Sequence, residues 1–251
     1  MIFLVNHPLI FFIVTLVVLW IFAHIGAFFR QRQHPAALED SDDYGLILGA
    51  TLTLLGLLIG FTFSMAAGRY DQRKNYEEEE ANAIGTEYVR TDLLPPADAA
   101  KVRSLLKEYL DLRVTYYLRL DAEHLQQNEA ATVDLQARLW AAITPAAHAQ
   151  PDAIRALVVS GMNDVLNRQG YTQAAFLNRV PVAAWLLMSL IAIFCNFLLG
   201  YRSVGKARVM FLILPIALAV SFLLVSDIDT PRRGVIMVHP QNLEILAGQL
   251  K

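Results

Sequence analysis

The chain has 251 residues, 55% of them hydrophobic, with a mean hydropathy of +0.40 and a formal net charge of -2. This composition favours a membrane protein, and the near-neutral charge gives no basis for nucleic-acid binding, which needs a clustered basic face. The single cysteine, Cys195, excludes an intramolecular disulfide, and the six histidines are scattered without metal-binding spacing. We therefore expect no metal and no cofactor.

Residues 1–68 contain two long uncharged runs and are expected to form a first transmembrane hairpin. The run over residues 9–29 lacks the positive flank and the cleavage site of a signal peptide, so we expect it to be retained as a span. The run over residues 45–68 is long enough to cross a bilayer at about 1.5 Å per residue. The acidic link between them favours the N-terminus of the second helix through its dipole.

The second run continues without a proline into a stretch rich in Glu, Ala, Arg and Lys, which predicts one long helix over residues 46–90. Small residues recur at every fourth position of its apolar half: Gly56, Gly60, Ser64 and Gly68. Such a stripe lets helix backbones approach closely, or leaves room around a narrow passage. It indicates either a packing or pore-lining helix of an oligomer, or ordinary helix packing within one chain.

Residues 69–179 are expected to form a soluble helical stalk domain. Asp98 can cap a helix over residues 99–127, whose apolar and tyrosine residues at three-to-four spacing form a stripe that faces a core. Further helices are expected over residues 129–143, ending at Thr144 and Pro145, and over residues 152–177. Because alternating strand patterns are nearly absent from the sequence, the expected fold class is all-α.

Residues 180–226 are expected to form a second transmembrane hairpin, with spans over residues 180–200 and 209–226. Trp185 and Tyr201 flank the first of these spans, as interfacial aromatic residues do. Residues 227–251 remain as a C-terminal tail at the membrane edge. The expected architecture is thus four transmembrane helices, with the stalk domain inserted between the second and third spans.

Charged residues gather where the second and fourth spans leave the membrane: Arg69, Arg73, Lys74, Glu77, Glu78, Asp227, Asp229, Arg232 and Arg233. On a solvated helix face, pairs such as Arg73 and Glu77 contribute only about 0.2–0.5 kcal/mol each. In a symmetric oligomer the same residues would form charged rings, which select ions by sign. We expect the turn after the last span to pair with residues 69–80 in a structural role.

Catalytic signatures are absent from the sequence: it has no nucleophile elbow, no Walker loop and no dinucleotide fingerprint. An enzyme is therefore not expected. The orientation in the membrane does not follow from charge, because one side of the spans has six basic residues and the other has Arg30, Arg32, Arg202, Lys206 and Arg208.

Two stretches are distinctive: GLLIGFTFSMAAGRYDQRKNYEEEEANAIGTEYVRTDLLP and the later DIDTPRRG. They resemble the bacterial bestrophin-like domain family of integral membrane proteins, and the order of elements agrees over the whole chain. More distantly, the second helix is similar to the passage of bestrophin anion channels in which an apolar helix runs into a Tyr-x-Arg segment. Tyr70 and Arg73 match that segment approximately, and its paired tryptophans are missing here.

Bestrophins are pentameric channels with four membrane helices, a cytosolic helical domain and cytosolic termini. The resemblance implies a homo-oligomer, pentameric, in the bacterial inner membrane, with the helical domain and termini in the cytoplasm. Its implied partners are identical subunits, the lipid bilayer and inorganic ions. It also implies that the second helix lines the pore, with a neck at Leu55, Ile59, Thr62 and Phe63.

The bestrophin calcium clasp is a dense acidic run after the last span, where this chain has only Asp227 and Asp229. Calcium gating is therefore not expected. The leading hypothesis is a bestrophin-like ion channel that is gated by dewetting at hydrophobic side chains such as Ile59 and Phe63. The alternative is a non-conducting membrane scaffold or sensor whose helical domain binds a partner protein. Which face of the second helix meets the axis stays open.

Overall fold

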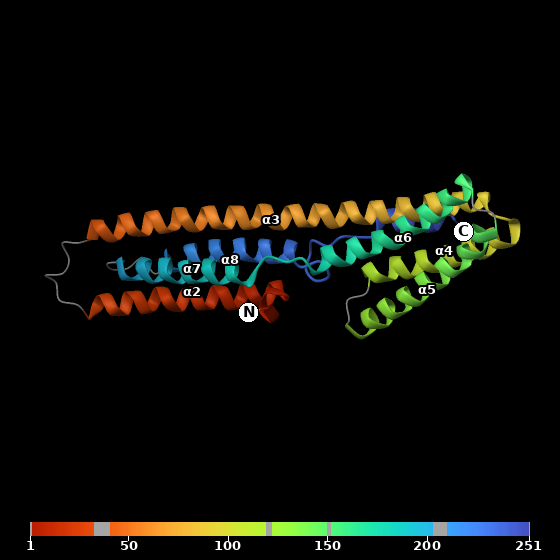
Figure 1. The fold of residues 1–251 in the computed structure, drawn as a ribbon. Coiled ribbons are helices and arrows are strands. Elements are labelled where there is room, and N and C mark those ends of the chain that lie inside the picture. Colours follow the sequence, from red (N-terminus) through yellow and green to blue (C-terminus); the bar gives the residue numbers. More distant parts are fainter. Residues whose placement is uncertain (1, 33–40, 119–121, 150–151, 203–209, 251) are drawn as a thin grey trace. The chain divides into compact units, whose positions relative to one another are not determined.

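The computed structural model describes residues 2–32, 41–118, 122–149, 152–202 and 210–250 (Figure 1). Within these ranges every regular element is a helix, which confirms the all-α prediction, and four helices are long and apolar enough to cross a membrane. The chain divides into two compact units. The membrane unit comprises Met1–Arg69 and Arg179–Met237, and the bundle unit comprises Tyr70–Asn178 and Val238–Lys251.

The membrane unit contains the four candidate spans. A short helix α1 (Ile2–Val5) precedes α2 (Pro8–Gln31), and the later spans are α7 (Val182–Arg202) and α8 (Met210–Asp229). The second span belongs to α3 (Ser41–Arg90), an unbroken helix of 50 residues and about 75 Å, as the sequence predicted. The expected links at residues 33–40 and 203–209 lie outside the described residues.

Two glycines bring α2 and α7 into backbone contact. A Cβ on Gly26 would lie 2.0 Å from the carbonyl oxygen of Phe197, and a Cβ on Gly200 would lie 1.8 Å from that of Ala23. Neither position has room for a side chain, so these glycines set the close approach of the two helices. They were not predicted as packing positions from the sequence.

The bundle unit packs the polar half of α3 with the helices α4 (Pro96–Leu118), α5 (Ala122–Ala149), α6 (Ala153–Leu177) and α9 (Gln241–Gln249); a 3-10 turn, η2 (Thr91–Leu93), follows α3. Their apolar faces form one core, whose fully buried members include Ile84, Val102, Leu106, Leu139, Val165 and Leu243. Tyr109 and Tyr116 are buried in this core as well, which confirms that the tyrosines of the stripe are structural.

Two helix limits of the bundle unit differ from the prediction. A single helix over residues 99–127 is wrong, because α4 ends at Leu118 and α5 begins at Ala122, and the two helices pack against each other in the core. The end expected at Pro145 is also wrong, since α5 continues to Ala149. Pro145 removes only one donor, and the burial of Ala146 in the core favours the remaining turn.

The C-terminal tail is divided between the units. Residues up to Met237 belong to the membrane unit, and Val238–Lys251 belong to the bundle unit, where Leu243 is fully buried. The unexpected helix α9 positions Leu243, Leu246 and Leu250 against the core at three-to-four spacing. The tail is therefore not one segment at the membrane edge.

Candidate functional site

In its apolar half, α3 presents one face to the other helices of the membrane unit. Leu55 and Ala66 have no exposed surface, and Thr62 is 5% exposed. The Thr62 hydroxyl donates to the Leu58 carbonyl at 2.7 Å and lies 3.5 Å from the Met188 sulfur of α7. Because these residues are spaced by four and seven, they define the inward face of the helix.

Two of the four neck candidates lie on this inward face. Leu55 and Thr62 are buried against other helices of the same chain, so their side chains have almost no surface to offer to an axial pore. Ile59 is half-buried and Phe63 is 39% exposed, both on the flank between the two faces. The expected neck is wrong for Leu55 and Thr62, because apolar character does not distinguish the two faces of a span.

The opposite, outward face of α3 is open. It comprises the predicted stripe and two bulky residues that follow its glycines, Leu57 and Phe61, which are 53% and 62% exposed. A Cβ on Gly56, Gly60 or Gly68 would meet no atom within 4 Å. For the described residues, ordinary packing within one chain is therefore the wrong interpretation of the stripe.

Leu57 and Phe61 were missed as candidates, although the sequence contains a signal for them. Each directly follows a glycine of the stripe, and residues spaced by four share a helix face. A bulky residue after each of Gly56 and Gly60 therefore projects beside the stripe. Their helical spacing relative to the stripe therefore predicts both residues, whereas apolar character alone does not.

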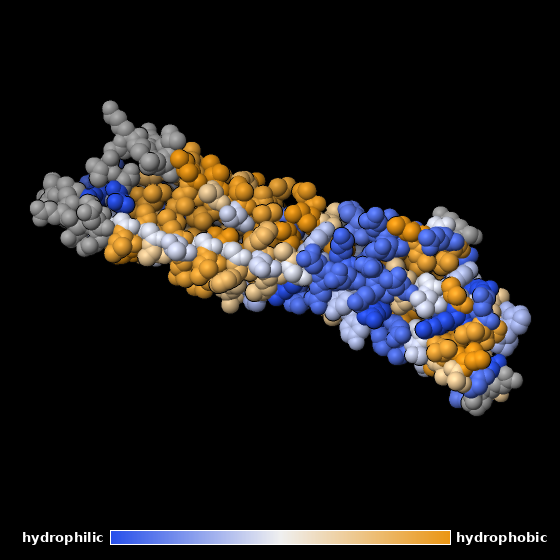
Figure 2. Space-filling model, turned by 90° about the horizontal axis from the view of Figure 1, so that it is seen from above, coloured by the Kyte–Doolittle hydropathy of each residue, from blue (hydrophilic) through white to orange (hydrophobic). Residues whose placement is uncertain are grey.

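The outward faces of the other spans have a different composition. The helices α2, α7 and α8 expose large apolar side chains, among them Ile13, Val17, Leu190, Ile213 and Val220. Such faces suit contact with lipid chains, whereas glycine and serine are typical of helix contacts or of room around a passage. Seen from the side on which α3 lies in Figure 1, a pale row of near-neutral residues crosses the hydrophobic surface of the membrane unit (Figure 2).

The outward face of α3 continues into its polar half. Asp71, Asn75 and Glu78 are exposed and follow Ser64 at helical spacing, and Lys74 is exposed beside them. These side chains are exposed to solvent in the single chain. For Lys74 and Glu78 this agrees with the interpretation of the segment as a solvated helix face. Among the exposed residues on this part of the outward face, the charged ones are therefore two carboxylates and one ammonium group.

For Arg73 and Glu77 the interpretation as a solvated face is wrong. Arg73 is fully buried in the bundle unit and donates to the carbonyl oxygens of Ala175 and Asn178, both at 3.1 Å. Glu77 is 1% exposed and accepts a hydrogen bond of 2.9 Å from the backbone N–H of Leu243 in the first turn of α9. Both charges thus hold segments of the bundle together.

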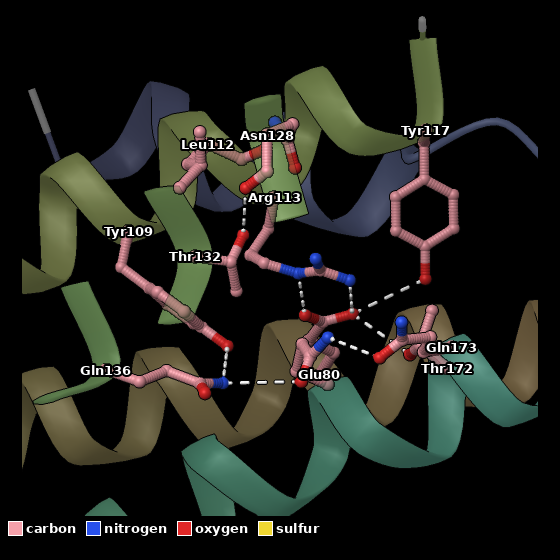
Figure 3. Close-up of polar contacts among 11 residues, drawn as sticks. Glu80, Tyr109, Leu112, Arg113, Tyr117, Asn128, Thr132, Gln136, Thr172 and Gln173 are labelled. Carbon is pink, nitrogen blue, oxygen red and sulfur yellow. Dashed lines mark hydrogen bonds and ion pairs between the residues drawn. The ribbon is translucent and has the colours of Figure 1, made fainter. Parts of the chain in front are cut away.

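Glu80, one turn further along α3, is the centre of a buried polar network (Figure 3). Its carboxylate pairs with the Arg113 guanidinium of α4, and it accepts from the hydroxyls of Thr172 at 3.1 Å and Tyr117 at 3.4 Å. Burial alone would lower the pKa of Arg113, but the charge of Glu80 raises it above its usual range; burial and Glu80 together also raise the pKa of Tyr117. The network joins α3, α4 and α6.

Glu87 is a third buried carboxylate in the bundle unit, after Glu77 and Glu80. Within the described chain neither of its oxygens has a hydrogen-bond partner, and a Cβ on Gly161 of α6 would lie 2.0 Å from Oε2. Burial raises its pKa from 4.5 to about 8, while the Arg90 guanidinium 4.0 Å away lowers it and Asp164 raises it. Glu87 is therefore mostly protonated at neutral pH.

The motif DIDTPRRG closes the end of α8. Asp227 accepts from the backbone N–H groups of Val235 at 2.9 Å and Ile236 at 2.8 Å. Gly234 has a φ of 118°, and a Cβ there would lie 2.1 Å from the carboxylate of Asp227. Both its backbone conformation and its surroundings therefore require glycine.

Asp229 fastens the end of α8 to two other segments of the membrane unit. It is fully buried and accepts from Arg179 Nε at 2.9 Å and from the backbone N–H of Val180 at 3.0 Å, and Arg69 of α3 lies 3.9 Å away. The expected structural pairing of this turn with residues 69–80 is thus confirmed for Arg69. The other members of the predicted charged cluster in that segment belong to the bundle unit: Arg73, Lys74, Glu77 and Glu78.

The last two predicted members of the charged cluster differ in exposure. Arg232 is half-buried, and Arg233 is exposed with its guanidinium hydrogen-bonded to Nε2 of His7. The described residues contain no group of three or more His, Cys, Asp or Glu side chains that could hold a metal ion. Both carboxylates of the motif are used by protein donors.

Comparison of the chain with known proteins identifies its family. The family model of the bestrophin-like domain matches residues 9–243. A bacterial bestrophin homologue from Klebsiella pneumoniae, solved by zinc phasing, is similar with a TM-score of 0.65 and 16% identity, covering 95% of this chain and 95% of that chain. A variant of that homologue with a tryptophan replaced by alanine has a TM-score of 0.65 and 15% identity, over 95% of this chain and 93% of that chain.

A further variant, with a tyrosine replaced by alanine, has a TM-score of 0.64 and 17% identity, over 94% of this chain and 99% of that chain. At these identities the likeness shows a shared fold. No curated protein matches the chain. The chain belongs to the bestrophin-like domain family, as its two motifs predicted, and it is a membrane protein with four candidate spans.

Proposed function

We propose that the protein is an oligomeric ion channel in which the outward face of α3 lines the pore. The observation that supports this most is the composition of the spans: the outward face of α3 has exposed glycines and a serine beside Leu57 and Phe61, whereas the exposed faces of α2, α7 and α8 consist mainly of large apolar residues. A face that suits lipid poorly is best covered by copies of the same chain around an axis. Membership of the bestrophin-like domain family supports the same arrangement.

The hydrophobic neck of this channel is formed by Leu57 and Phe61, in place of Leu55 and Thr62. Both side chains project from the outward face, beside Gly56 and Gly60, which leave room around them. A ring of such side chains closes a narrow passage by dewetting. The flanking residues Ile59 and Phe63 then lie toward the neighbouring subunits.

The charges that follow on the same face favour cations. Asp71 and Glu78 are exposed and lie in line with Ser64, and Lys74 is the single cation among them. In a ring of subunits this gives twice as many carboxylates as ammonium groups along the axis, and rings of carboxylates favour cations. The passing ions are therefore inorganic cations.

The assembly contains identical subunits, five of them by the resemblance to bestrophins, in the bacterial inner membrane. The bundle unit and both termini lie in the cytoplasm. A reporter enzyme inserted near Gln127 of α5, active only in the periplasm, tests this orientation. The proposal expects no periplasmic activity, and strong activity would contradict it.

Recordings from planar bilayers, together with the oligomer mass in mild detergent, test the channel. The proposal expects oligomers, ionic currents, and larger or more persistent currents for Phe61→Ala, because the neck is then wider and less hydrophobic. Ile213→Ala is the matched control, since Ile213 is equally exposed at 62% but lies on α8. A strictly monomeric protein, or equal effects of the two substitutions, would contradict the proposal.

The alternative function is a non-conducting scaffold or sensor whose bundle unit binds a partner protein. It is supported by large apolar side chains that the bundle unit exposes in the single chain: Val133, Trp140, Ile154, Leu157 and Leu177. Oligomers that stay silent in planar bilayers, together with a specific soluble protein recovered on the wild type and lost with Trp140→Ala, would favour it over the channel.

A further inference from the structure

A groove in the membrane unit lies between the beginning of α2 and the end of α8. It has a volume of about 720 Å³, and its walls are mainly apolar, with Leu9 and Ile10 on one side and Val220, Leu223 and Leu224 on the other. Volumes of this size are typical of small-molecule sites. None of the residues that the pore proposal uses lines this groove.

One end of the groove is polar and includes an exposed cation. His7, Asp227 and Arg233 lie there. Asp227 accepts from the backbone N–H groups of Val235 and Ile236, so its charge is compensated by the loop. Arg233 donates to His7, and its planar guanidinium has five N–H donors in all, which leaves several for an anion in the groove.

The surrounding contacts hold the two sides of the groove in place. The carbonyl oxygen of Val5 accepts hydrogen bonds from the hydroxyls of Ser226 at 2.8 Å and Thr230 at 3.3 Å. These bonds tie the segment before α2 to the last turn of α8. Both sides of the groove are therefore held in place within the membrane unit.

We propose that this groove binds a membrane glycerophospholipid, with the lipid phosphate on Arg233 and an acyl chain along Leu9, Val220 and Leu224. An apolar groove with a guanidinium group at one end is complementary to an amphiphilic molecule with an anionic headgroup. The groove also lies at the ends of two candidate spans, where lipid headgroups meet the chains. Val235, which is 87% exposed beside Arg233, adds an apolar loop tip at the same place.

Native mass spectrometry of the detergent-purified protein with added phosphatidylglycerol tests the site. One lipid per subunit is expected to be retained, and Arg233→Ala weakens its binding about fivefold, the effect of one arginine on an anionic lipid. Arg32→Ala is the matched control, because Arg32 is an exposed arginine of the same unit outside the groove. It is expected to bind like the wild type.

A second pair of variants tests the acyl-chain part. Val220→Trp fills the groove and is expected to reduce lipid retention, whereas Ile213→Trp, on an exposed part of α8 outside the groove, leaves it unchanged. Diacylglycerol with the same chains lacks the phosphate, and glycerol phosphate lacks the acyl chains. Each is expected to bind more weakly than phosphatidylglycerol. All variants are compared at equal helix content and oligomer mass.

Three results would overturn the proposal. They are unchanged lipid retention in both Arg233→Ala and Val220→Trp, equal retention of diacylglycerol, or cysteine cross-links showing that a second copy of the chain covers the groove. None of these readouts depends on ion conduction. The lipid-site proposal can therefore be refuted while the channel proposal holds, and the channel proposal can be refuted while the lipid-site proposal holds.

Discussion

Adding a side chain at a glycine has opposite expected effects on the two sides of the membrane unit. At Gly60, on the outward face of α3, a Cβ meets no atom within 4 Å, whereas at Gly200, on α7, it would lie 1.8 Å from a backbone carbonyl oxygen of Ala23. Substitutions at these two glycines therefore separate effects on the fold of the single chain from effects of what lies against the outward face of α3.

The magnitudes follow from these surroundings. Gly60→Leu is expected to leave the fold of the chain intact and to gain up to about 1 kcal/mol of helix propensity, while its side chain projects from the outward face. Gly200→Ala forces α2 and α7 apart, which costs about 1–3 kcal/mol. If α3 lines a pore, Gly60→Leu narrows it, and the current falls although the subunit is as stable as before.

Unfolding in mild detergent measures the stability of the chain, and planar-bilayer recording measures the current through the proposed pore. We expect a normal unfolding midpoint and reduced current for Gly60→Leu, and a lowered midpoint for Gly200→Ala. Equal destabilisation by the two substitutions would refute the assignment of the open face. A stable Gly60→Leu protein with wild-type current would refute the placement of Gly60 at the pore.

Three further predictions concern charges. Arg113→Met leaves Glu80 buried without its cation and should lower the free energy of unfolding by about 3–5 kcal/mol; adding Glu80→Gln should restore part of it in a thermal unfolding assay. Between pH 4.5 and about 8 the folded protein retains a proton on Glu87 that the unfolded chain releases, so stability falls as pH rises through this window. Glu87→Gln should flatten that fall by more than about 1 kcal/mol between pH 5 and pH 9, and an unchanged slope would contradict the raised pKa of the buried Glu87 carboxyl. Asp71→Asn with Glu78→Gln should reduce the preference for cations in reversal-potential measurements, and an unchanged reversal potential would exclude a role for these carboxylates in selectivity.

The helical architecture of this chain is well determined by local patterns. Uncharged runs define the four candidate spans, and the stretch over residues 46–90, which contains no proline and has a polar half rich in good helix formers, gives α3. The stripe from Gly56 to Gly68 was identified, but its surroundings depend on which helices lie nearby. In the structure the close approach of α2 and α7 uses Gly26 and Gly200, whereas Gly56, Gly60 and Gly68 face no atom within 4 Å.

The charged residues show a similar limit. Arg73, Glu77 and Glu80 have the composition of a solvated helix face, and they are buried because α4, α6 and α9 bring donors and acceptors from distant parts of the sequence. Lys74 and Glu78 stay exposed, and only their position on the other face of α3 distinguishes them from these buried residues. Burial of a polar half-helix follows from tertiary partners, and these are not local.

Cysteine accessibility tests most directly whether the outward face of α3 lines a pore. In a Cys195→Ser background, which removes the buried native thiol, single cysteines replace Phe61, Ser64 or Leu55. A charged, membrane-impermeant thiol reagent applied during planar-bilayer recording should block the Phe61→Cys and Ser64→Cys channels and leave Leu55→Cys unaffected. Block at Leu55 alone, or no block at Phe61 and Ser64, would contradict the account.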